Sequence, residues 1–352
     1  MDTLTHALSG ALIARATAGR GGDPTLPLAR RVALGALAAT FPDADIVMAL
    51  GSPIDYLLNH RGVTHSLVML PLWAWLLAWI AARVMRDARG ARPYFAVCAM
   101  GIGIHIAGDV ITSYGTMIFA PLSDARYALG TTFVIDLVFS GIILAGLAAS
   151  WLWQSSRVPA LAACALLAAY VGMQAVLRGE ALEAGRAYAR AQGLEGATVS
   201  AIERPVSPFN WTIVVAKGED QRYADVNLLR TRMPAPAGKD AGLIARISSG
   251  FVPVSMAHWR HAARFGASPE DQRLAREAWS QPAFWFFRWF ADYPALHRID
   301  RGNPSDCVWF EDLRFALTGR GSVPFRYGMC RKSGGPWQAF QLRADGARLR
   351  LQ

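Results

Sequence analysis

Long stretches without a charged side chain dominate the first half of this chain. Residues 66–82 carry no charge and are followed at once by an arginine cluster at residues 83–92. This pattern is typical of a membrane-spanning helix with a basic flank. Other apolar stretches of similar length lie at residues 3–18, 32–50, 93–108, 137–153 and 158–177. We therefore predict an α-helical polytopic membrane domain with about six segments. The pattern is weakest in the two segments nearest the N-terminus, at residues 3–18 and 32–50.

The charge distribution separates this domain from the rest of the chain. The first 177 residues hold eleven Arg, nine Asp, no Lys and no Glu, a net charge of +2, whereas residues 178–352 carry +8. With 53% hydrophobic and 18% charged residues overall, the chain is neither an intrinsically disordered protein nor a coiled coil. We predict a membrane domain over residues 1–177 and a soluble domain over residues 178–352. The basic charge of the second domain favours anionic lipid headgroups or other phosphate-rich partners.

The second half has the sequence pattern of an α+β domain. A helical pattern covers residues 269–290, and short β-prone runs flank it on both sides. These runs lie at residues 197–202, 211–216, 223–229, 308–317, 323–329 and 337–342. The aromatic string from Trp285 to Phe290 indicates either a helix packed on the sheet or a surface that rests on the bilayer.

Positively charged residues orient the predicted segments. Arginines at positions 20, 30 and 31, in the 83–92 cluster and at position 157 fall on alternate connections, and the positive-inside rule places such connections in the cytoplasm. The other connections and residues 178–352 are then expected on the outer side. Met1-Asp2 is not the basic start of a signal peptide, so we expect the N-terminus to be retained and the protein to stay anchored. Cys307 and Cys330 could then form a disulfide between neighbouring strands.

Ionisable residues inside the apolar half call for an explanation. Four of the seven histidines lie within the first 110 residues, accompanied by several aspartates, although an uncompensated charge in a membrane costs at least about 2.5–3.5 kcal/mol. His105 and Asp109 are spaced i,i+4, so both side chains lie on one helical face and can bind the same ion. A plain His–Asp hydrogen bond is the alternative for this pair. The Pro42-Asp43-Ala44-Asp45 and His60–His65 segments could likewise be a helix cap or a solvated loop.

The predicted topology brings these residues to one depth. Eight His and Asp residues fall near the outer ends of the predicted segments or in the outer loop between them: His6, Asp43, Asp45, His60, His65, His105, Asp109 and Asp136. Imidazole and carboxylate together are the ligand set of zinc or another borderline divalent ion such as manganese or iron. We predict a divalent metal site, with zinc preferred, that holds one or two ions.

Four short motifs resemble, in order and in spacing, the family of membrane-bound metal-dependent hydrolases, also described as LexA-binding, inner-membrane-associated hydrolases. They are Thr5-His6-Ala7-Leu8-Ser9-Gly10, Pro42-Asp43-Ala44-Asp45, His60-Arg61-Gly62-Val63-Thr64-His65-Ser66, and His105-Ile106-Ala107-Gly108-Asp109 with Thr112-Ser113-Tyr114-Gly115 behind it. The resemblance covers about residues 1–140, and the tail resembles the extension of longer members. It implies an inner-membrane location and distant kinship with the helical zinc-dependent phospholipases C.

The resemblance also implies a set of metal ligands. These are His6, Asp43, Asp45, His60, His65, His105 and Asp109. Many members of the family have a histidine directly after the Pro-Asp-x-Asp string. This chain has Ile46 there, so that ligand is absent.

The expected chemistry is hydrolysis by a metal-activated water. A divalent ion lowers the pKa of bound water to about 7. A second ion or Arg61 would stabilise charge on a phosphoryl oxygen, and Asp45 or Asp136 would act as general base. A site at the membrane surface would meet a lipid or a lipid-linked phosphoester. We expect no specific nucleic-acid partner, and the sequence identifies no protein partner.

Two other classes of protein fit the same residues. The His and Asp set could line an ion path in a transporter, or a structural metal could support a non-catalytic membrane scaffold. The chain has no Gly-x-Ser-x-Gly elbow, which argues against a serine hydrolase. No strand precedes Gly101-Ile102-Gly103, so these glycines predict close helix packing and no dinucleotide site.

Overall fold

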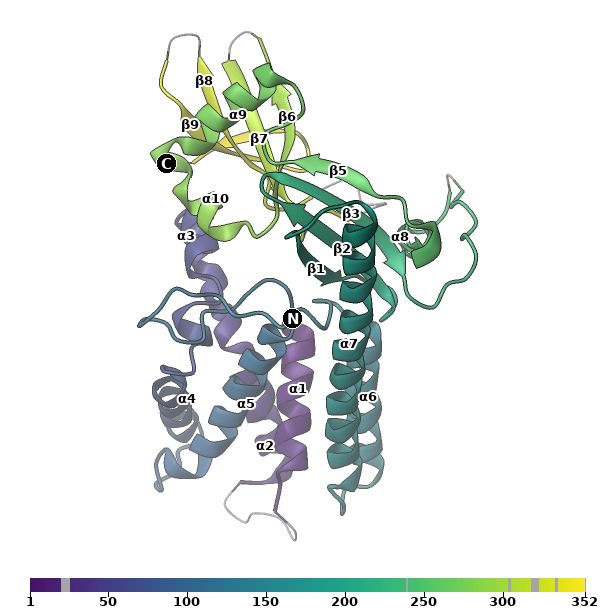
Figure 1. Cartoon of the computed structure of the whole chain (residues 1–352). Coiled ribbons are helices and arrows are strands. Elements are labelled where there is room, and N and C mark those ends of the chain that lie inside the picture. Colours follow the sequence, from purple (N-terminus) through teal and green to yellow (C-terminus); the bar gives the residue numbers. More distant parts are fainter. Residues whose placement is uncertain (20–25, 239, 303–304, 318–322, 333–334, 352) are drawn as a thin grey trace. The chain divides into compact units, whose positions relative to one another are not determined.

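The fold is taken from a computed structural model, which describes residues 1–19, 26–238, 240–302, 305–317, 323–332 and 335–351. The chain packs as two compact units, each of which gathers two stretches of sequence (Figure 1). The helical unit comprises Met1–Gly51 and Asn59–Val176, and the second unit comprises Ser52–Leu58 and Leu177–Gln352. The boundary at Val176 lies inside one long helix, α7 (Val158–Ala191).

The helical unit is built from short and medium-length helices. They are α1 (Thr3–Ala16), α2 (Leu28–Thr40), η1 (Pro42–Leu50), η2 (Val63–His65), α4 (Leu70–Val84), α5 (Arg92–Val110), α6 (Leu137–Leu152) and the first part of α7. The segment between η1 and η2 carries α3 (Pro53–Asn59), nearly all of which packs with the second unit. Asp2 caps α1 by accepting a hydrogen bond from the Thr5 amide at 3.0 Å.

Small residues let α1, α2 and α5 approach one another closely. A Cβ at Gly10 would lie 2.2 Å from the carbonyl oxygen of Gly35, and a Cβ at Gly101 would lie 2.9 Å from the same oxygen. Only glycine fits at such contacts, as is common where membrane helices pack. The packing role predicted for Gly101 is confirmed. A Cβ at Gly103 would meet nothing closer than Leu70 Cδ1 at 3.8 Å, so Gly103 has no such role.

The helical unit does not support six membrane segments. Among the described residues, α5 and α7 are long and apolar enough to cross a membrane. Two bent helix pairs raise the number to four if each pair is counted as one segment: Leu28–Thr40 with Pro42–Leu50, bent by 41°, and Pro53–His65 with Leu70–Val84, bent by 79°. The runs at residues 3–18 and 137–153 form helices of 14 and 16 residues, shorter than the roughly 20 residues that cross a bilayer.

The second unit contains two five-stranded sheets among its described residues. The first sheet has the order β1 (Thr198–Glu203), β2 (Asn210–Lys217), β3 (Asp220–Asn227), β4 (Val252–Pro253), with β5 (Arg260–Ala263) also paired to β3. The second has the order β10 (Arg348–Arg350), β9 (Gln338–Leu342), β8 (Tyr327–Lys332), β7 (Ser305–Asp312), β6 (Pro294–Asp300). All pairs are antiparallel except β3 with β4.

The α+β character of the second unit is confirmed. Buried Ile202 and Val214 of the first sheet join Ala295 and Leu313 in one apolar cluster, which ties the two sheets together. Cys307 lies directly opposite Cys330 in the register of β7 and β8, and the two form a disulfide. The remaining elements of the unit are α8 (Leu243–Ser249), η3 (Val254–Met256), α9 (Pro269–Ser280), η4 (Pro282–Phe284) and α10 (Trp285–Phe290).

The helix expected over residues 269–290 is broken. α9 ends at Ser280, and α10 begins at Trp285 after Pro282 opens a short 3-10 turn, as expected because proline lacks the amide hydrogen that would continue the helix. Phe286, Phe287 and Phe290 are fully buried, whereas Trp285 is exposed. The aromatic string therefore packs into the unit, in agreement with the first of its two predicted interpretations.

Candidate metal centre

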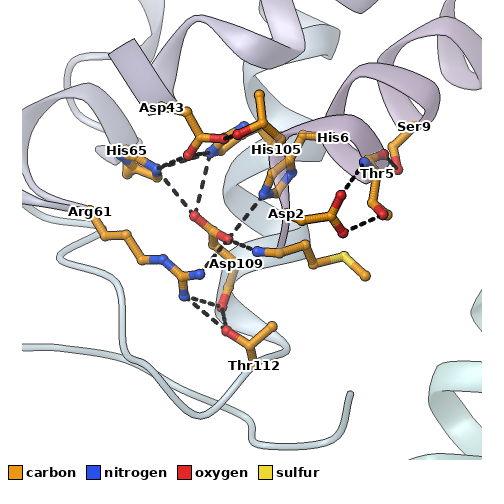
Figure 2. A network of polar contacts seen from close by, with 12 residues as sticks. Asp2, Thr5, His6, Ser9, Asp43, Arg61, His65, His105, Asp109 and Thr112 are labelled. Carbon is orange, nitrogen blue, oxygen red and sulfur yellow. Dashed lines mark hydrogen bonds and ion pairs between the residues drawn. The ribbon is translucent and has the colours of Figure 1, made fainter. Parts of the chain in front are cut away.

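Five His and Asp side chains from four separate elements of the helical unit converge on one point (Figure 2). They are His6 of α1, Asp43 of η1, His65 of η2, and His105 and Asp109 of α5. One turn of α5 separates His105 from Asp109, so both face the same way, as their spacing predicts. His65, His105 and Asp109 are fully buried, and the side chain of Asp43 is 17% exposed. Asp43 is therefore the member through which water can reach the cluster.

Four ligand atoms face one another at the spacing of a coordination shell. His65 Nε2 lies 2.9 Å from His105 Nε2 and 3.1 Å from Asp109 Oδ2, and His105 Nε2 lies 3.4 Å from the same oxygen. Asp43 Oδ1 lies 3.9 Å from His65 Nε2 and 3.7 Å from His105 Nε2. A tetrahedral zinc with bonds of about 2.0–2.1 Å separates its ligand atoms by about 3.3 Å. The cluster thus has the dimensions of a single-ion site.

Hydrogen bonding fixes which ring nitrogen of His105 is available. His105 Nδ1 lies 2.6 Å from the carbonyl oxygen of Ala39, which can only accept, so we assign the ring proton to Nδ1. The lone pair of Nε2 then points at His65 Nε2. At 2.9 Å the two nitrogens form an N–H···N hydrogen bond when the His65 proton is on Nε2. With the His65 proton on Nδ1 instead, both Nε2 lone pairs are available to one divalent ion.

The two carboxylate oxygens of Asp109 have different environments. Oδ1 lies 3.1 Å from His6 Nε2 and 2.9 Å from Arg61 Nη2, and it also contacts the Met1 amine. Oδ2 is buried and accepts no hydrogen bond from any residue that the structure describes. Leaving a buried carboxylate oxygen without a hydrogen bond is costly, and coordination of a cation would remove that cost. The residues present therefore fit a divalent ion.

The possible ligands form two groups of three residues that share His105. His6, His105 and Asp109 offer ligand atoms within 4.8 Å of one another, as do Asp43, His65 and His105. The His6 ring stacks on the His105 ring, with centroids 3.6 Å apart and an angle of 19° between the planes. Because both groups use His105, they describe one shared centre.

Asp45 and His60 lie at the edge of this centre. Asp45 Oδ1 lies 2.9 Å from His60 Nδ1, and Oδ2 accepts a hydrogen bond from the Arg61 amide at 3.0 Å. The same Oδ2 lies 3.4 Å from His65 Nδ1. Carboxylates that contact the outer nitrogen of a ligand histidine fix its tautomer and orientation. Asp45 therefore contacts the Nδ1 atoms of two histidines, His60 and His65. Among the described residues, neither Asp45 nor His60 belongs to the two ligand groups.

Arg61 is a buried cross-link within the cluster. Its guanidinium bonds Asp109 through Nη2 and the Thr112 hydroxyl through Nη1, both at 2.9 Å, and lies over the Tyr114 ring. The backbone at Arg61 has φ 61°, a left-handed conformation that is uncommon for residues other than glycine. This turn brings the Arg61 amide onto Asp45 and the side chain onto Asp109, so the geometry gives Arg61 a positioning role.

Asp136 lies elsewhere than the sequence predicts. Its Oδ1 caps α6 by accepting hydrogen bonds from the Val138 and Phe139 amides, both at 2.9 Å, and its Oδ2 accepts one from the Tyr170 hydroxyl at 2.8 Å. None of these contacts joins it to the His and Asp cluster. A sequence cannot distinguish a helix cap from a catalytic carboxylate, because the same residue type serves both.

Three threonines contact residues of the centre, although the sequence motifs assign them no role and Thr3 lies outside the motifs. Thr3 donates a hydrogen bond to Asp43 Oδ2 at 2.6 Å, Thr64 donates one to Asp45 Oδ2 at 3.3 Å, and Thr112 accepts from Arg61. The spacing of Thr3 and His6, one turn apart on α1, was the available signal for the first of them.

The comparisons with known proteins identify the family. The model of the YdjM inner membrane protein family matches residues 1–181, just over half of the chain. The chain belongs to this family. The match covers every residue of the metal centre, and it agrees with the inner-membrane location that the sequence predicts. The description of the family names no metal, substrate or reaction.

One curated relative is similar over about half of the chain. "Uncharacterized protein YfhP" of Bacillus subtilis (strain 168) is 29% identical over 176 residues, which is 49% of this chain and 52% of the relative. The chain thus spans about half the length of the curated relative it matches. No solved structure matches the chain.

Proposed function

We propose that this protein is a divalent-metal-dependent phosphoester hydrolase of the inner membrane, which acts on a lipid or a lipid-linked phosphate. The observation that carries the proposal is the pair of ring nitrogens His65 Nε2 and His105 Nε2, which lie 2.9 Å apart and each within 3.9 Å of one oxygen of Asp43 and one of Asp109. Their imidazole and carboxylate chemistry favours zinc over magnesium or calcium, with manganese or iron as alternatives.

In the proposed reaction, some residues of the centre bind the ion and others transfer a proton. When bound, a divalent ion supplies a hydroxide at neutral pH by lowering the pKa of a coordinated water to about 7. Asp45 Oδ1 holds His60 through Nδ1 at the edge of the centre, and we assign the general base to this Asp–His pair. Arg61 holds Asp109 in place and so keeps its Oδ2 directed at the ligand set.

Two further features support the proposal, one for the substrate class and one for the side of the membrane on which the second unit lies. The site belongs to a unit whose α5 is apolar enough to cross a membrane, so its natural surroundings are lipid. The Cys307–Cys330 disulfide favours an oxidising compartment for the second unit, and we propose that this unit lies on the periplasmic side of a multi-pass protein.

The test is lipid phosphoester hydrolysis by the detergent-purified full chain. The assay would measure phosphate and headgroup release from mixed micelles of phosphatidic acid and phosphatidylglycerol with added Zn²⁺. His60→Ala is expected to lower turnover about 100-fold or more with metal content unchanged, whereas Asp43→Asn lowers both. His261→Ala, on exposed β5, is the matched control and keeps full turnover. A metal-loaded wild type that hydrolyses neither lipid would contradict the proposal and favour a scaffold.

A further inference from the structure

An apolar cavity of about 400 Å³ lies within the helical unit. Its walls are faces of three helices, and Phe139 of α6 closes one side. On α7 the lining residues Cys164, Leu167, Ala168 and Val171 follow the i, i+3, i+4, i+7 pattern of a single helix face. The facing walls are supplied by Ile104, Ala107 and Gly108 of α5, by Ile111 directly after it, and by Ser9, Leu12 and Ile13 of α1.

The cavity offers a ligand almost no polar contact. No charged residue is among those that line it, and its one hydroxyl, on Ser9, is occupied because Ser9 donates to the Thr5 carbonyl oxygen at 2.8 Å. Ala107 and Ala168 on the lining are exposed, so the cavity is not sealed. A cavity of this size and lining suits an aliphatic chain and excludes a charged or sugar-like ligand.

Gly108 connects the cavity to the metal centre. It lines the cavity, and a Cβ at this position would lie 3.2 Å from His6 Cε1. The next residue is Asp109, whose Oδ1 lies 3.1 Å from His6 Nε2. Gly108 therefore borders both the cavity and His6 and directly precedes a second member of the cluster.

We propose that this cavity binds an acyl chain of a membrane phospholipid and thereby holds its phosphoester headgroup beside the metal centre. Hydrolysis of the bound headgroup rests on the proposed function. The acyl-chain site itself can be tested without turnover. In an inner membrane, acyl chains are the apolar groups that meet the exposed edge of the cavity, and they fill it by close packing because they leave no water behind.

The experiment is photo-crosslinking of the full chain in nanodiscs with phosphatidylglycerol that carries a diazirine in one acyl chain. Mass spectrometry would compare the label on residues 104–111 and 164–171 with the label on the exposed α6 surface around Leu144. Ala168→Trp and Val171→Trp, made separately, would each fill the cavity. Ala169→Trp, next along α7 and exposed but outside the lining, is the control.

The expected result is a several-fold loss of label at residues 104–111 in both filling variants, with label around Leu144 and bound metal unchanged. Unaltered label at residues 104–111 in both filling variants would overturn the acyl-chain site, whatever the turnover. Loss of label on filling, together with a wild type that shows no hydrolysis, would leave the acyl-chain site standing and overturn only the proposed function.

Discussion

At the scale of single residues, the geometry of the centre depends on contacts that hold each possible ligand through an atom that does not face the others. Ala39 fixes the His105 ring through its carbonyl oxygen, Asp45 contacts His65 Nδ1, and Arg61 holds one oxygen of Asp109 while the other faces the ligand set. Such supporting contacts decide whether four side chains from three elements are preorganised for an ion.

Thr3→Ala removes the hydroxyl that donates to Asp43 Oδ2 at 2.6 Å. Because an outer contact of a metal ligand is worth about 10–100-fold in metal affinity, we expect Zn²⁺ affinity to fall by that factor, as measured by competition with a chromogenic chelator. Thr17→Ala, at the opposite end of α1 and bonded to the Ile13 carbonyl oxygen, should bind Zn²⁺ like the wild type. Equal affinity in the two variants would refute the role given to Thr3.

The residue types of the site could be predicted from the sequence, but their division of labour could not. The motifs point to His6, Asp43, His65, His105 and Asp109, and the structure brings these five together. The sequence gives Asp45 and His60 the same standing as the others, although their mutual hydrogen bond sets them at the edge. Spacing along a chain does not say which carboxylate oxygen faces which ring across elements distant in sequence.

At the scale of elements, the contact of α1, α2 and α5 positions His6 against Asp109. Gly10 and Gly35 permit it, since an added Cβ on either would approach the other's carbonyl oxygen to 2.6 Å or less. Both the close packing and the metal centre therefore depend on the same helix faces.

Gly35→Ala should destabilise the helical unit. The new methyl would meet Ala14 Cβ at 2.5 Å, and overpacking of this kind costs about 1–3 kcal/mol. Gly141→Ala on α6 is the control, because a Cβ there meets nothing within 4 Å and alanine favours a helix by up to about 1 kcal/mol. Thermal unfolding in detergent would show a lower midpoint for Gly35→Ala alone. Similar midpoints for the two variants would refute the close contact.

The disulfide between β7 and β8 makes a prediction for the second unit. Replacing both Cys307 and Cys330 by serine should lower the free energy of unfolding by about 2–4 kcal/mol, and reductant should have the same effect on the wild type. Chemical denaturation followed by Trp fluorescence would measure both. If the serine variant unfolds at the wild-type denaturant concentration in the absence of reductant, the disulfide has no stabilising role.

The elements themselves were predictable to different degrees. The strands expected at residues 197–202, 211–216 and 223–229 are β1, β2 and β3, since alternating patterns between turns are a local signal. β5 and β6 were missed, because Arg260–Ala263 and Pro294–Asp300 become strands through their partners and not through their own composition. The bend after α2 was also missed, although Pro42 begins η1 there.

At the scale of the whole molecule, the chain joins a helical unit with a candidate metal site to an α+β unit with a disulfide. The charge asymmetry between the halves predicts a boundary at residue 177, because membrane and aqueous surroundings select different compositions. It gives no sign that Ser52–Leu58 packs with the second unit. The number of membrane segments was not predictable by counting apolar runs. Buried helices of a compact unit are as apolar as spanning ones, and only the length of each helix separates the two.

Sidedness gives the prediction at this scale. In intact spheroplasts, a membrane-impermeant maleimide should label Ser280→Cys, at the exposed end of α9, but not Ala88→Cys, in the exposed connection before α5. The reason is that the arginine-rich connection is expected in the cytoplasm and the second unit outside. Lysis should then expose Ala88→Cys to the reagent. The reverse labelling pattern would contradict the proposed orientation.

The central claim is that His105 and Asp109 hold a divalent ion, and metal analysis of the detergent-purified protein tests it most directly. Inductively coupled plasma mass spectrometry would compare the wild type with His105→Ala, Asp109→Asn and the exposed control His261→Ala. We predict about one to two equivalents of zinc, manganese or iron in the wild type and the control, and their loss in both site variants. Well-folded site variants with the same metal content as the wild type would contradict the account.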